Sequence, residues 1–260
     1  MPKLSISIVV YQSYKDITLA IETIEKFTDN RIEKIIYVVD NSGKEWNDER
    51  RQFTEFLKQY DDIVYLDTGE NLGFGRGHNF VRDRIDSEYH AIVNPDIIMT
   101  EDSFRKMIDY LESHEDVGMC IPKMTDEDGK VQLVYRRELT VWDLLVRTFF
   151  KKFVPGRYAY HTMQDMNYEE EFQVPFGQGS FLVVRTPLFK ELGGFDDHYF
   201  LYMEDADFCK RVNAVSKLMY YSGTSVIHKW ERGSHKNLGL LKCHICSAVY
   251  YFKKWGFRWS

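Results

Sequence analysis

The chain has 260 residues, which is long enough to bury a substantial hydrophobic core in one large domain. Hydrophobic residues make up 44% of it, and no apolar run approaches the ~20 residues that a membrane-spanning helix needs, so the composition indicates a globular domain that does not cross a bilayer. The formal net charge of −6 argues against nucleic acid as a general partner.

The first third of the chain alternates between predicted strands and predicted helices. Apolar runs predict strands at 4–10, 35–40, 63–66, 90–94 and 117–122. Helical spacing of apolar residues predicts helices at 16–27, 49–60, 77–85 and 101–114. Such alternation predicts an α/β fold with a mostly parallel central sheet and helices on both faces.

The second half is less regular. Residues 126–129 predict a hairpin turn, 141–152 an amphipathic helix, and 155–171 a mobile loop over a site. The remaining predicted elements are strands at 181–184 and 218–227 and helices starting at Pro187, covering 204–212 and covering 240–253. We expect a main domain over 1–235, followed by a C-terminal helix within 236–260.

The C-terminal segment differs in charge from the rest of the chain. From Lys229 onward there are seven Lys or Arg residues and one acid, together with several aromatic side chains. This composition fits a helix packed on the domain equally well as one that docks on an anionic membrane surface. The chain opens without an export signal, and its four cysteines show no disulfide framework, so we expect a cytoplasmic location.

Polar residues end three of the predicted strands. Tyr11 ends the first, Asp40 the second, and Asn94-Pro95-Asp96 the fourth. Ligands of open α/β sheets bind beyond the carboxyl ends of the strands, so these residues are candidate ligand contacts. The Asp40 carboxylate can accept a hydrogen bond from a pyrimidine ring or a ribose hydroxyl. The same residue can also form a turn in the sequence D-N-S-G, and the sequence leaves both interpretations open.

A glycine-rich loop spans residues 71–77 and precedes a predicted helix. Backbone N–H groups at such a position can hold phosphate, although a simple tight turn is an alternative. The spacing G-x-G-x-G after the third strand does not match the dinucleotide fingerprint, which follows the first strand. A hydride-transfer enzyme is therefore poorly supported.

Three later acidic or imidazole positions can carry chemistry. Asp96 can bind Mg²⁺ or Mn²⁺, and His228, at the end of a later strand, can supply a second ligand. Asp205, next to Glu204 at a predicted helix start, can act as a general base, and the neighbouring aromatic residues should raise its pKa. The alternatives are a structural histidine and helix capping by the acids.

Taken together, these segments resemble the inverting family 2 glycosyltransferases with the GT-A fold. The resemblance runs from about residue 4 to about residue 228. It rests on the order of V-V-D-N-S (38–42), N-L-G-F-G-R-G-H-N (71–79), N-P-D-I (94–97), G-Q-G-S-F-L-V-V-R (177–185), G-G-F-D (193–196) and Y-M-E-D-A-D-F-C-K-R (202–211). The form N-P-D-I and the chain length look most like bacterial rhamnosyltransferases of O-antigen or cell-wall polysaccharide synthesis.

The resemblance implies a role for each candidate residue. Asp205 would be the catalytic base with Glu204 as a supporting neighbour, and Asp96 and His228 would hold Mg²⁺ or Mn²⁺. The nucleotide would be bound by Tyr11, Asp40, Asn71, Gly73, Asn79 and Asn94. The acceptor and donor sugars would be bordered by Gly179, Ser180, Phe195 and Asp196. The implied fold is one Rossmann-like GT-A domain plus the C-terminal helix.

Two departures from the family pattern bear on these roles. Gln12-Ser13 follows Tyr11 where the family usually has Asn, which should alter nucleotide contacts. Asn94 replaces the first acid of the D-x-D motif, so metal affinity should be modest.

The resemblance implies transfer of a sugar, with dTDP-rhamnose as the first candidate donor, to a saccharide acceptor linked to lipid. A peripheral contact with the inner face of the cell membrane would follow. Two other functions are alternatives. A sugar-1-phosphate nucleotidyltransferase should have a Gly-rich, basic loop directly after the first strand, and Tyr11–Tyr14 is not one. A sugar-binding module without catalysis would not need both Asp96 and Glu204-Asp205.

Overall fold

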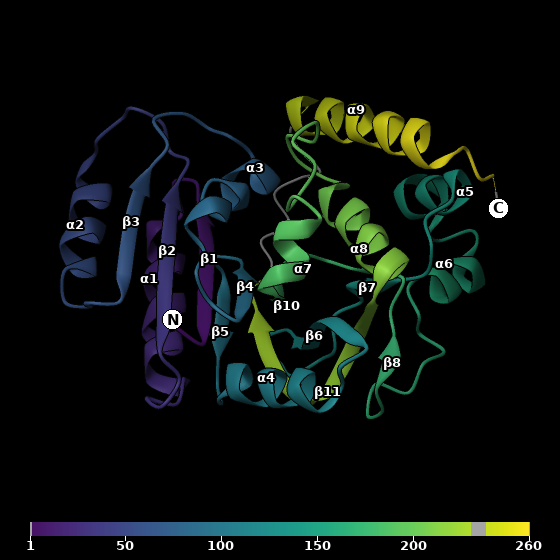
Figure 1. The fold of residues 1–260 in the computed structure, drawn as a ribbon. Coiled ribbons are helices and arrows are strands. Elements are labelled where there is room, and N and C mark those ends of the chain that lie inside the picture. Colours follow the sequence, from purple (N-terminus) through teal and green to yellow (C-terminus); the bar gives the residue numbers. More distant parts are fainter. Residues whose placement is uncertain (1, 230–237, 260) are drawn as a thin grey trace.

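A nine-stranded sheet runs through the molecule, counted over the residues that the structure describes (Figure 1). The structure is a computed structural model and describes residues 2–229 and 238–259. The strand order is β3-β2-β1-β4-β10-β6-β11-β5, and β8 also pairs with β11. The strands are β1 (Leu4–Val10), β2 (Lys34–Asp40), β3 (Ile63–Asp67), β4 (Tyr89–Val93), β5 (Ile97–Met99), β6 (Val117–Thr125), β8 (Phe172–Gln173), β10 (Phe181–Arg185) and β11 (Lys217–His228).

Helices cover this sheet, and a second, two-stranded sheet pairs β7 (Tyr135–Arg136) with β9 (Phe176–Gly177). The helices are α1 (Tyr14–Phe27), α2 (Asp48–Leu57), α3 (Phe74–Asn79), the 3₁₀ turn η1 (Arg82–Arg84), α4 (Ser103–Ser113), α5 (Val141–Leu145), the π-helical turn η2 (Val146–Phe150), α6 (Pro155–His161), α7 (Thr186–Glu191), α8 (Glu204–Val215) and α9 (Leu238–Trp255).

The direction of the strands changes halfway across the sheet. The first half is parallel, since β1 pairs in parallel with both β2 and β4, and β2 with β3. In the second half β10 runs antiparallel to β4 and β6, and β5 antiparallel to β11. The sheet is therefore mixed rather than mostly parallel. The reversed strand β10 brings the residues before Phe181 beside the carboxyl end of β4.

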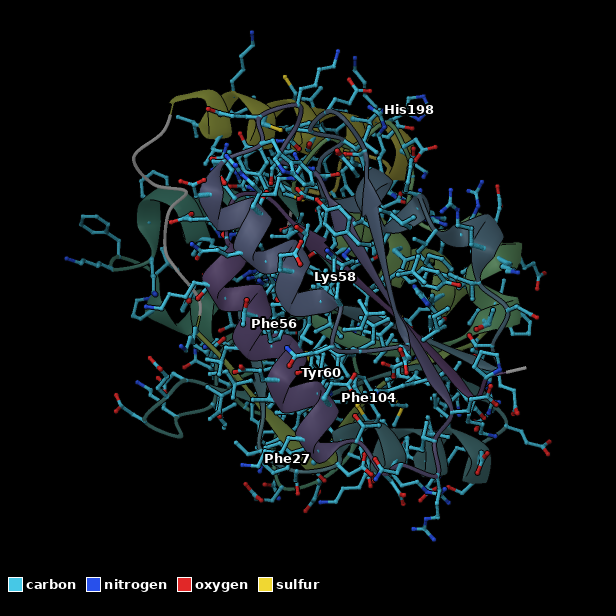
Figure 2. All side chains as sticks on the ribbon, turned by 90° about the vertical axis from the view of Figure 1, so that its left-hand side faces the viewer. Phe27, Phe56, Lys58, Tyr60, Phe104 and His198 are labelled. Carbon is cyan, nitrogen blue, oxygen red and sulfur yellow. The ribbon has the colours of Figure 1, made fainter. Side chains whose placement is uncertain are left out.

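Strands β1 and β4 in the first half of the sheet are largely buried on both faces, as is usual for parallel strands covered by helices, whereas the edge strand β3 is only half-buried. Every second residue of β1 from Leu4 to Val10 is apolar and fully buried. The intervening serines, Ser5 and Ser7, are fully buried as well. On one face α1 buries the apolar positions at helical spacing from Ile17 to Ile24. At the end of α2, the rings of Phe56 and Tyr60 pack edge to face with centroids 5.5 Å apart (Figure 2).

The predicted elements are confirmed with three exceptions. The helix expected at 77–85 begins earlier, at Phe74, and ends at Asn79. The amphipathic helix expected at 141–152 is divided between α5 and the π turn η2. The mobile loop expected over 155–171 begins with the helix α6, which has Pro155 in its first turn, where the missing N–H is not needed. The hairpin turn at 126–129 is present, closed by the Gly129 N–H on the Asp126 carbonyl at 3.0 Å.

The predicted C-terminal helix is confirmed as α9, which lies against α8 and close to α5 (Figure 1). Lys254 pairs with Asp207 of α8 at 2.7 Å, and the Val141 N–H of α5 donates to the Arg258 carbonyl at 2.8 Å. The expected boundary between residues 235 and 236 lies outside the described residues. Within the described part of the chain, none of the helices combines the length and the apolar character needed to span a bilayer.

Candidate active site

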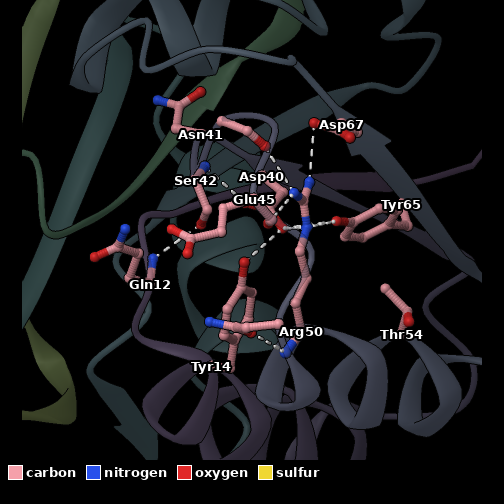
Figure 3. A network of polar contacts seen from close by, with 12 residues as sticks. Gln12, Tyr14, Asp40, Asn41, Ser42, Glu45, Arg50, Thr54, Tyr65 and Asp67 are labelled. Carbon is pink, nitrogen blue, oxygen red and sulfur yellow. Dashed lines mark hydrogen bonds and ion pairs between the residues drawn. The ribbon is translucent and has the colours of Figure 1, made fainter.

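Asp40, at the end of β2, lies at the centre of a buried polar network (Figure 3). Its Oδ2 accepts hydrogen bonds from the hydroxyls of Tyr65 at 2.6 Å and Tyr14 at 3.1 Å, and it pairs with Arg50 Nε at 2.9 Å. Its Oδ1 accepts the Ser42 N–H at 2.8 Å, which is the turn that the sequence D-N-S-G predicts. Both carboxylate oxygens are thus engaged within the protein. A direct contact between Asp40 and a nucleobase stays a prediction.

Arg50 is the residue of this network that the sequence did not indicate. It lies in the first turn of α2, where a charged side chain normally faces solvent, yet its side chain is 1% exposed. Its Nη2 pairs with Asp67 at 2.9 Å, and its guanidinium lies 4.5 Å from the centre of the Trp46 ring. Arg50 therefore joins the ends of β2 and β3. Tyr11, at the end of β1, is 51% exposed and leaves the same edge of the sheet open to a ligand.

The glycine-rich loop is fixed from two sides. Gly73 has a φ of +80°, and a Cβ atom there would lie 1.9 Å from the Phe200 carbonyl oxygen, so only glycine fits. The Asn41 side chain donates to the Gly73 carbonyl at 2.8 Å. The Gly73 N–H donates to the Asn71 side chain at 2.9 Å, which closes a local turn. The loop is held rigidly against the end of β2 and the segment before α8.

Asn79, Phe195 and Asp196 form a support behind this loop. The Asn79 side chain exchanges two hydrogen bonds with the backbone of Phe195, at 2.7 and 2.9 Å. Phe195 is 2% exposed, and its ring packs 5.6 Å from that of Phe74. Asp196 pairs with Lys254 of α9 at 2.7 Å. These three side chains are directed to one another, to the core and to α9, and their contacts with nucleotide or sugar stay predictions.

Asp96 and His228 are brought together from positions far apart in the sequence. Asp96 Oδ2 lies 3.4 Å from His228 Nε2, and the Lys229 N–H donates to the Asp96 carbonyl at 3.1 Å. Asp96 Oδ1 is buried and has no hydrogen-bond partner among the described residues. A carboxylate oxygen without a partner beside an imidazole nitrogen fits a divalent cation. No group of three or more His, Cys, Asp or Glu residues suited to a metal occurs within 2–229 and 238–259, so protein ligands would be few.

Gln132 orients His228, and the sequence did not indicate it. The Gln132 amide nitrogen donates to the His228 carbonyl at 2.6 Å, which turns the amide oxygen to His228 Nδ1 at 2.9 Å. An oxygen acceptor at Nδ1 places the ring proton on that nitrogen. Nε2, which faces Asp96, is then the nitrogen that can coordinate a cation.

The segment Gly179-Ser180 links the end of β4 to α8. The Asn94 N–H donates to the Ser180 carbonyl at 2.8 Å, and the Gly179 N–H approaches Asp205 Oδ2 at 3.4 Å. A Cβ on Gly179 would touch both Asp205 and Phe74 at 3.4 Å, so the three elements meet at this residue. Asn94, Asp96, Gly179, Ser180, Asp205 and His228 therefore gather at one edge of the sheet.

Glu204 and Asp205 occupy the first turn of α8 in different surroundings. Two residues with positive φ, Tyr202 at 70° and Met203 at 69°, turn the chain into the helix. Glu204 is buried, and burial next to Asp205 raises its pKa well above the usual range. Burial also raises the pKa of Asp205, but nearby positive charge and its backbone N–H bonds oppose that rise. Asp205 is therefore the carboxyl group of the two whose charged form has stabilising positive charge nearby, which suits it to act as a base.

The positive charges near Asp205 are those of Arg136 and Arg147. Arg136 lies in β7 with its guanidinium 5.1 Å from the centre of the Phe176 ring, and Arg147 lies in η2. Both come from the second half of the chain, whose predicted elements are less regular. The one sequence signal for positive charge here is the basic pair Arg136-Arg137 close to the predicted hairpin.

Comparison with known proteins bears directly on this arrangement. The model of Glycosyl transferase family 2 matches residues 5–193. "Rhamnosyltransferase WbbL" of Escherichia coli (strain K12) is 27% identical over 211 residues, which are 77% of each protein. "N-acetylglucosaminyl-diphospho-decaprenol L-rhamnosyltransferase" of Mycobacterium tuberculosis (strain ATCC 25618 / H37Rv) is 27% identical over 186 residues, which are 66% of this chain and 60% of that protein.

Solved structures share the fold at low sequence identity. The mannosyltransferase PcManGT from Pyrobaculum calidifontis, in complex with GDP-Man and Mn²⁺, has a TM-score of 0.64 at 13% identity. The match covers 89% of this chain and 58% of the mannosyltransferase chain. GalNAc-T7 with UDP, GalNAc and Mn²⁺ has a TM-score of 0.69 at 14% identity. The match covers 91% of this chain and 45% of the GalNAc-T7 chain. This chain thus spans only about half the length of these two structures.

Proposed function

Because the chain belongs to glycosyl transferase family 2 and has the GT-A fold, it is a glycosyltransferase, and we propose that it transfers a sugar with inversion from a nucleotide donor to a saccharide hydroxyl. The observation that carries this proposal is that the Gly179-Ser180 segment contacts both Asn94, two residues before Asp96, and Asp205. In the proposed arrangement Asp96 lies on the donor side and Asp205 on the acceptor side. Family membership also favours a transferase over a nucleotidyltransferase or a sugar-binding module.

Asp205 acts as the general base in this mechanism. The acceptor hydroxyl attacks the anomeric carbon, the new glycosidic bond forms, and the bond to the leaving diphosphate oxygen breaks. The hydroxyl proton passes to Asp205. Glu204 stays protonated in this mechanism, so Asp205 is the one ionised carboxylate of the pair.

Asp96 and His228 are proposed to hold Mg²⁺ or Mn²⁺ on the donor side. A divalent cation there would neutralise negative charge on the leaving diphosphate. The partnerless Oδ1 of Asp96 and the orientation of His228 by Gln132 support this assignment. Mn²⁺ in two related structures is consistent with divalent metal use in the fold.

The nucleotide is proposed to lie along the edge formed by Tyr11, Asp40 and the loop 71–79, with Asn94 beside it. Tyr11 offers an exposed ring on which a base can stack. Asp40 contributes through the turn that it holds with Ser42, because both of its oxygens already have protein partners.

The proposed donor is dTDP-rhamnose, and the proposed pathway is surface polysaccharide synthesis. The support is that two relatives at 27% identity are named rhamnosyltransferases. The mycobacterial name includes an acceptor on diphospho-decaprenol, and we propose a lipid-linked acceptor for this chain as well.

The outer face of α9 supports a peripheral contact with the inner face of the membrane. Leu241, Ile245 and Val249 recur every four residues and are 44%, 55% and 44% exposed. Exposed lysines at 242 and 253 lie on the same helix. Apolar side chains flanked by lysines are typical of helices that dock on anionic lipid.

Flotation with anionic liposomes tests this contact. The protein should float with the lipid, Ile245→Glu should abolish flotation, and Val215→Glu, which changes a 64% exposed residue on α8, should leave it intact. Failure of the unchanged protein to float would contradict membrane docking.

The transfer itself is tested with a panel of nucleotide sugars in the presence of Mn²⁺ or Mg²⁺, read by release of nucleoside diphosphate. We expect release from one donor, with dTDP-rhamnose tested first, and faster release when a lipid-linked saccharide is added. Absence of release from every donor and acceptor would overturn the proposed activity, and release from a different donor would overturn the rhamnose assignment alone.

A further inference from the structure

Arg136 approaches the candidate base along the small sheet. In the pairing of β7 with β9, Arg136 lies opposite Phe176, and β9 leads within three residues to Gly179, whose N–H faces Asp205. The Cys209 thiol of α8 donates to the Gly177 carbonyl at 3.3 Å, which holds β9 against the helix that carries Asp205. The position of Arg136 is thus built into the fold rather than left to a flexible side chain.

Arg136 and Arg147 differ from the arginines beside them in having no carboxylate within ion-pair distance among the described residues. Arg137 pairs with Asp165 at 2.7 Å, and Arg157 pairs with Asp143 at 2.6 Å. Arg136 Nε, by contrast, is buried and lacks a hydrogen-bond partner within the described ranges. A buried guanidinium nitrogen without a hydrogen-bond partner is unfavourable, so an anion is expected to complete the site when substrate binds.

Arg147 connects this site to the C-terminal helix. Its Nη2 donates to Nε2 of His244 at 3.2 Å, so η2 and α9 meet at this contact. His244 is followed directly by Ile245, which belongs to the exposed apolar face of α9. The two arginines therefore lie between the candidate base and the surface proposed to contact lipid.

We propose that Arg136 and Arg147 bind a phosphate group of the acceptor, next to the sugar whose hydroxyl loses its proton to Asp205. The guanidinium fork matches phosphate oxygens, which gives both charge and geometry to the site. The proposal rests on the proposed transfer function. It makes the substrate a lipid diphosphate that carries its acceptor sugar directly on the phosphate, because the phosphate site and Asp205 are neighbours.

A diphosphate could also come from the nucleotide donor. One observation favours the acceptor. Arg147 contacts His244 of α9, the helix that bears the residues proposed to face lipid. An experiment must nevertheless treat the two sources as separate arms.

The test compares the binding of two probes to the full chain by calorimetry. Farnesyl diphosphate without metal reports on the arginine site, and dTDP with Mn²⁺ reports on the donor site. Arg136→Gln and Arg147→Gln should each weaken farnesyl diphosphate binding about tenfold or more, since each removes charged hydrogen bonds to phosphate. Both variants should bind dTDP within about twofold of the unchanged protein, which also shows that they are folded.

Arg137→Gln is the matched control, because Arg137 is adjacent in sequence and already paired with Asp165, and it should bind both probes normally. Farnesol, which lacks phosphate, should bind all variants alike. Unchanged farnesyl diphosphate affinity in both arginine variants would overturn the proposal, and so would a loss confined to dTDP. Neither result would contradict the proposed transfer function, which is measured separately by nucleoside diphosphate release.

Discussion

The two halves of the candidate site differ in how completely their charges are paired. At the ends of β2 and β3, Asp40 and Arg50 are fully enclosed, and every oxygen of Asp40 has a partner. At the ends of β4 and β10, Asp96 Oδ1, the Ser180 hydroxyl and Arg136 Nε are buried without partners among the described residues. In the first half Arg50 Nη2 lacks a hydrogen bond but is ion-paired with Asp67 at 2.9 Å, whereas the second half has hydrogen-bonding capacity that a ligand can use. We infer that the first half supports the site and the second carries out the chemistry.

Replacing Asp96 should have the largest effect on ligand binding. Asp96→Ala removes one of the two candidate metal ligands, so Mn²⁺-dependent binding of dTDP should be lost while the fold is retained. Calorimetry with and without Mn²⁺ measures this. Binding that remained unchanged in the presence of Mn²⁺ would refute the assignment of Asp96 to the metal.

Replacing Arg50 should have the largest effect on stability. Arg50→Ala leaves Asp40 buried without its cation, which should lower the free energy of unfolding by about 3–5 kcal/mol. Arg51→Ala is the matched control, since Arg51 forms an exposed pair with Asp48 and should change stability by less than about 1 kcal/mol. Chemical denaturation measures both, and equal effects would remove the distinction between a supporting and a reactive half.

Replacing Gln132 should weaken the metal site without dismantling it. Gln132→Leu removes the acceptor that keeps the proton on His228 Nδ1, and loss of such a partner typically lowers metal affinity about 10- to 100-fold. Titration with Mn²⁺ reads the affinity, and ¹⁵N NMR of the metal-free protein reads the tautomer. A histidine protonated at Nδ1 in the variant as before would show that Gln132 does not set the tautomer.

Replacing Glu204 should produce the smallest change, visible in the pH dependence of stability. Because its folded-state pKa is raised, the folded protein binds more protons than the unfolded chain above the ordinary pKa of Glu, so stability falls as pH increases through that interval. Glu204→Gln should flatten this decline. Denaturation curves between pH 5 and 8 measure it, and an unchanged slope would argue against a protonated Glu204.

The sequence predicted the positions of most long strands and helices along the chain because apolar runs and helical spacing are local signals, but it did not predict that the sheet is mixed. The expectation that Asp96 and Asp205 serve one site followed from motif order, which the resemblance supplied. Residues that act through distant contacts left no local signal. Gln132 contacts His228 across 96 positions, and Arg50 looks like a solvent-facing residue of a helix start. The short helix α6 was missed because its seven residues give too few turns for periodicity to show.

The most direct test of the proposed division of labour is Asp205→Asn, which keeps the shape of the side chain and removes its basicity. Turnover and the affinity for dTDP with Mn²⁺ should be measured on the same preparation. The proposed mechanism predicts a loss of turnover of roughly 100-fold or more, with little change in dTDP affinity. Near-normal turnover would contradict the assignment of Asp205 as the base.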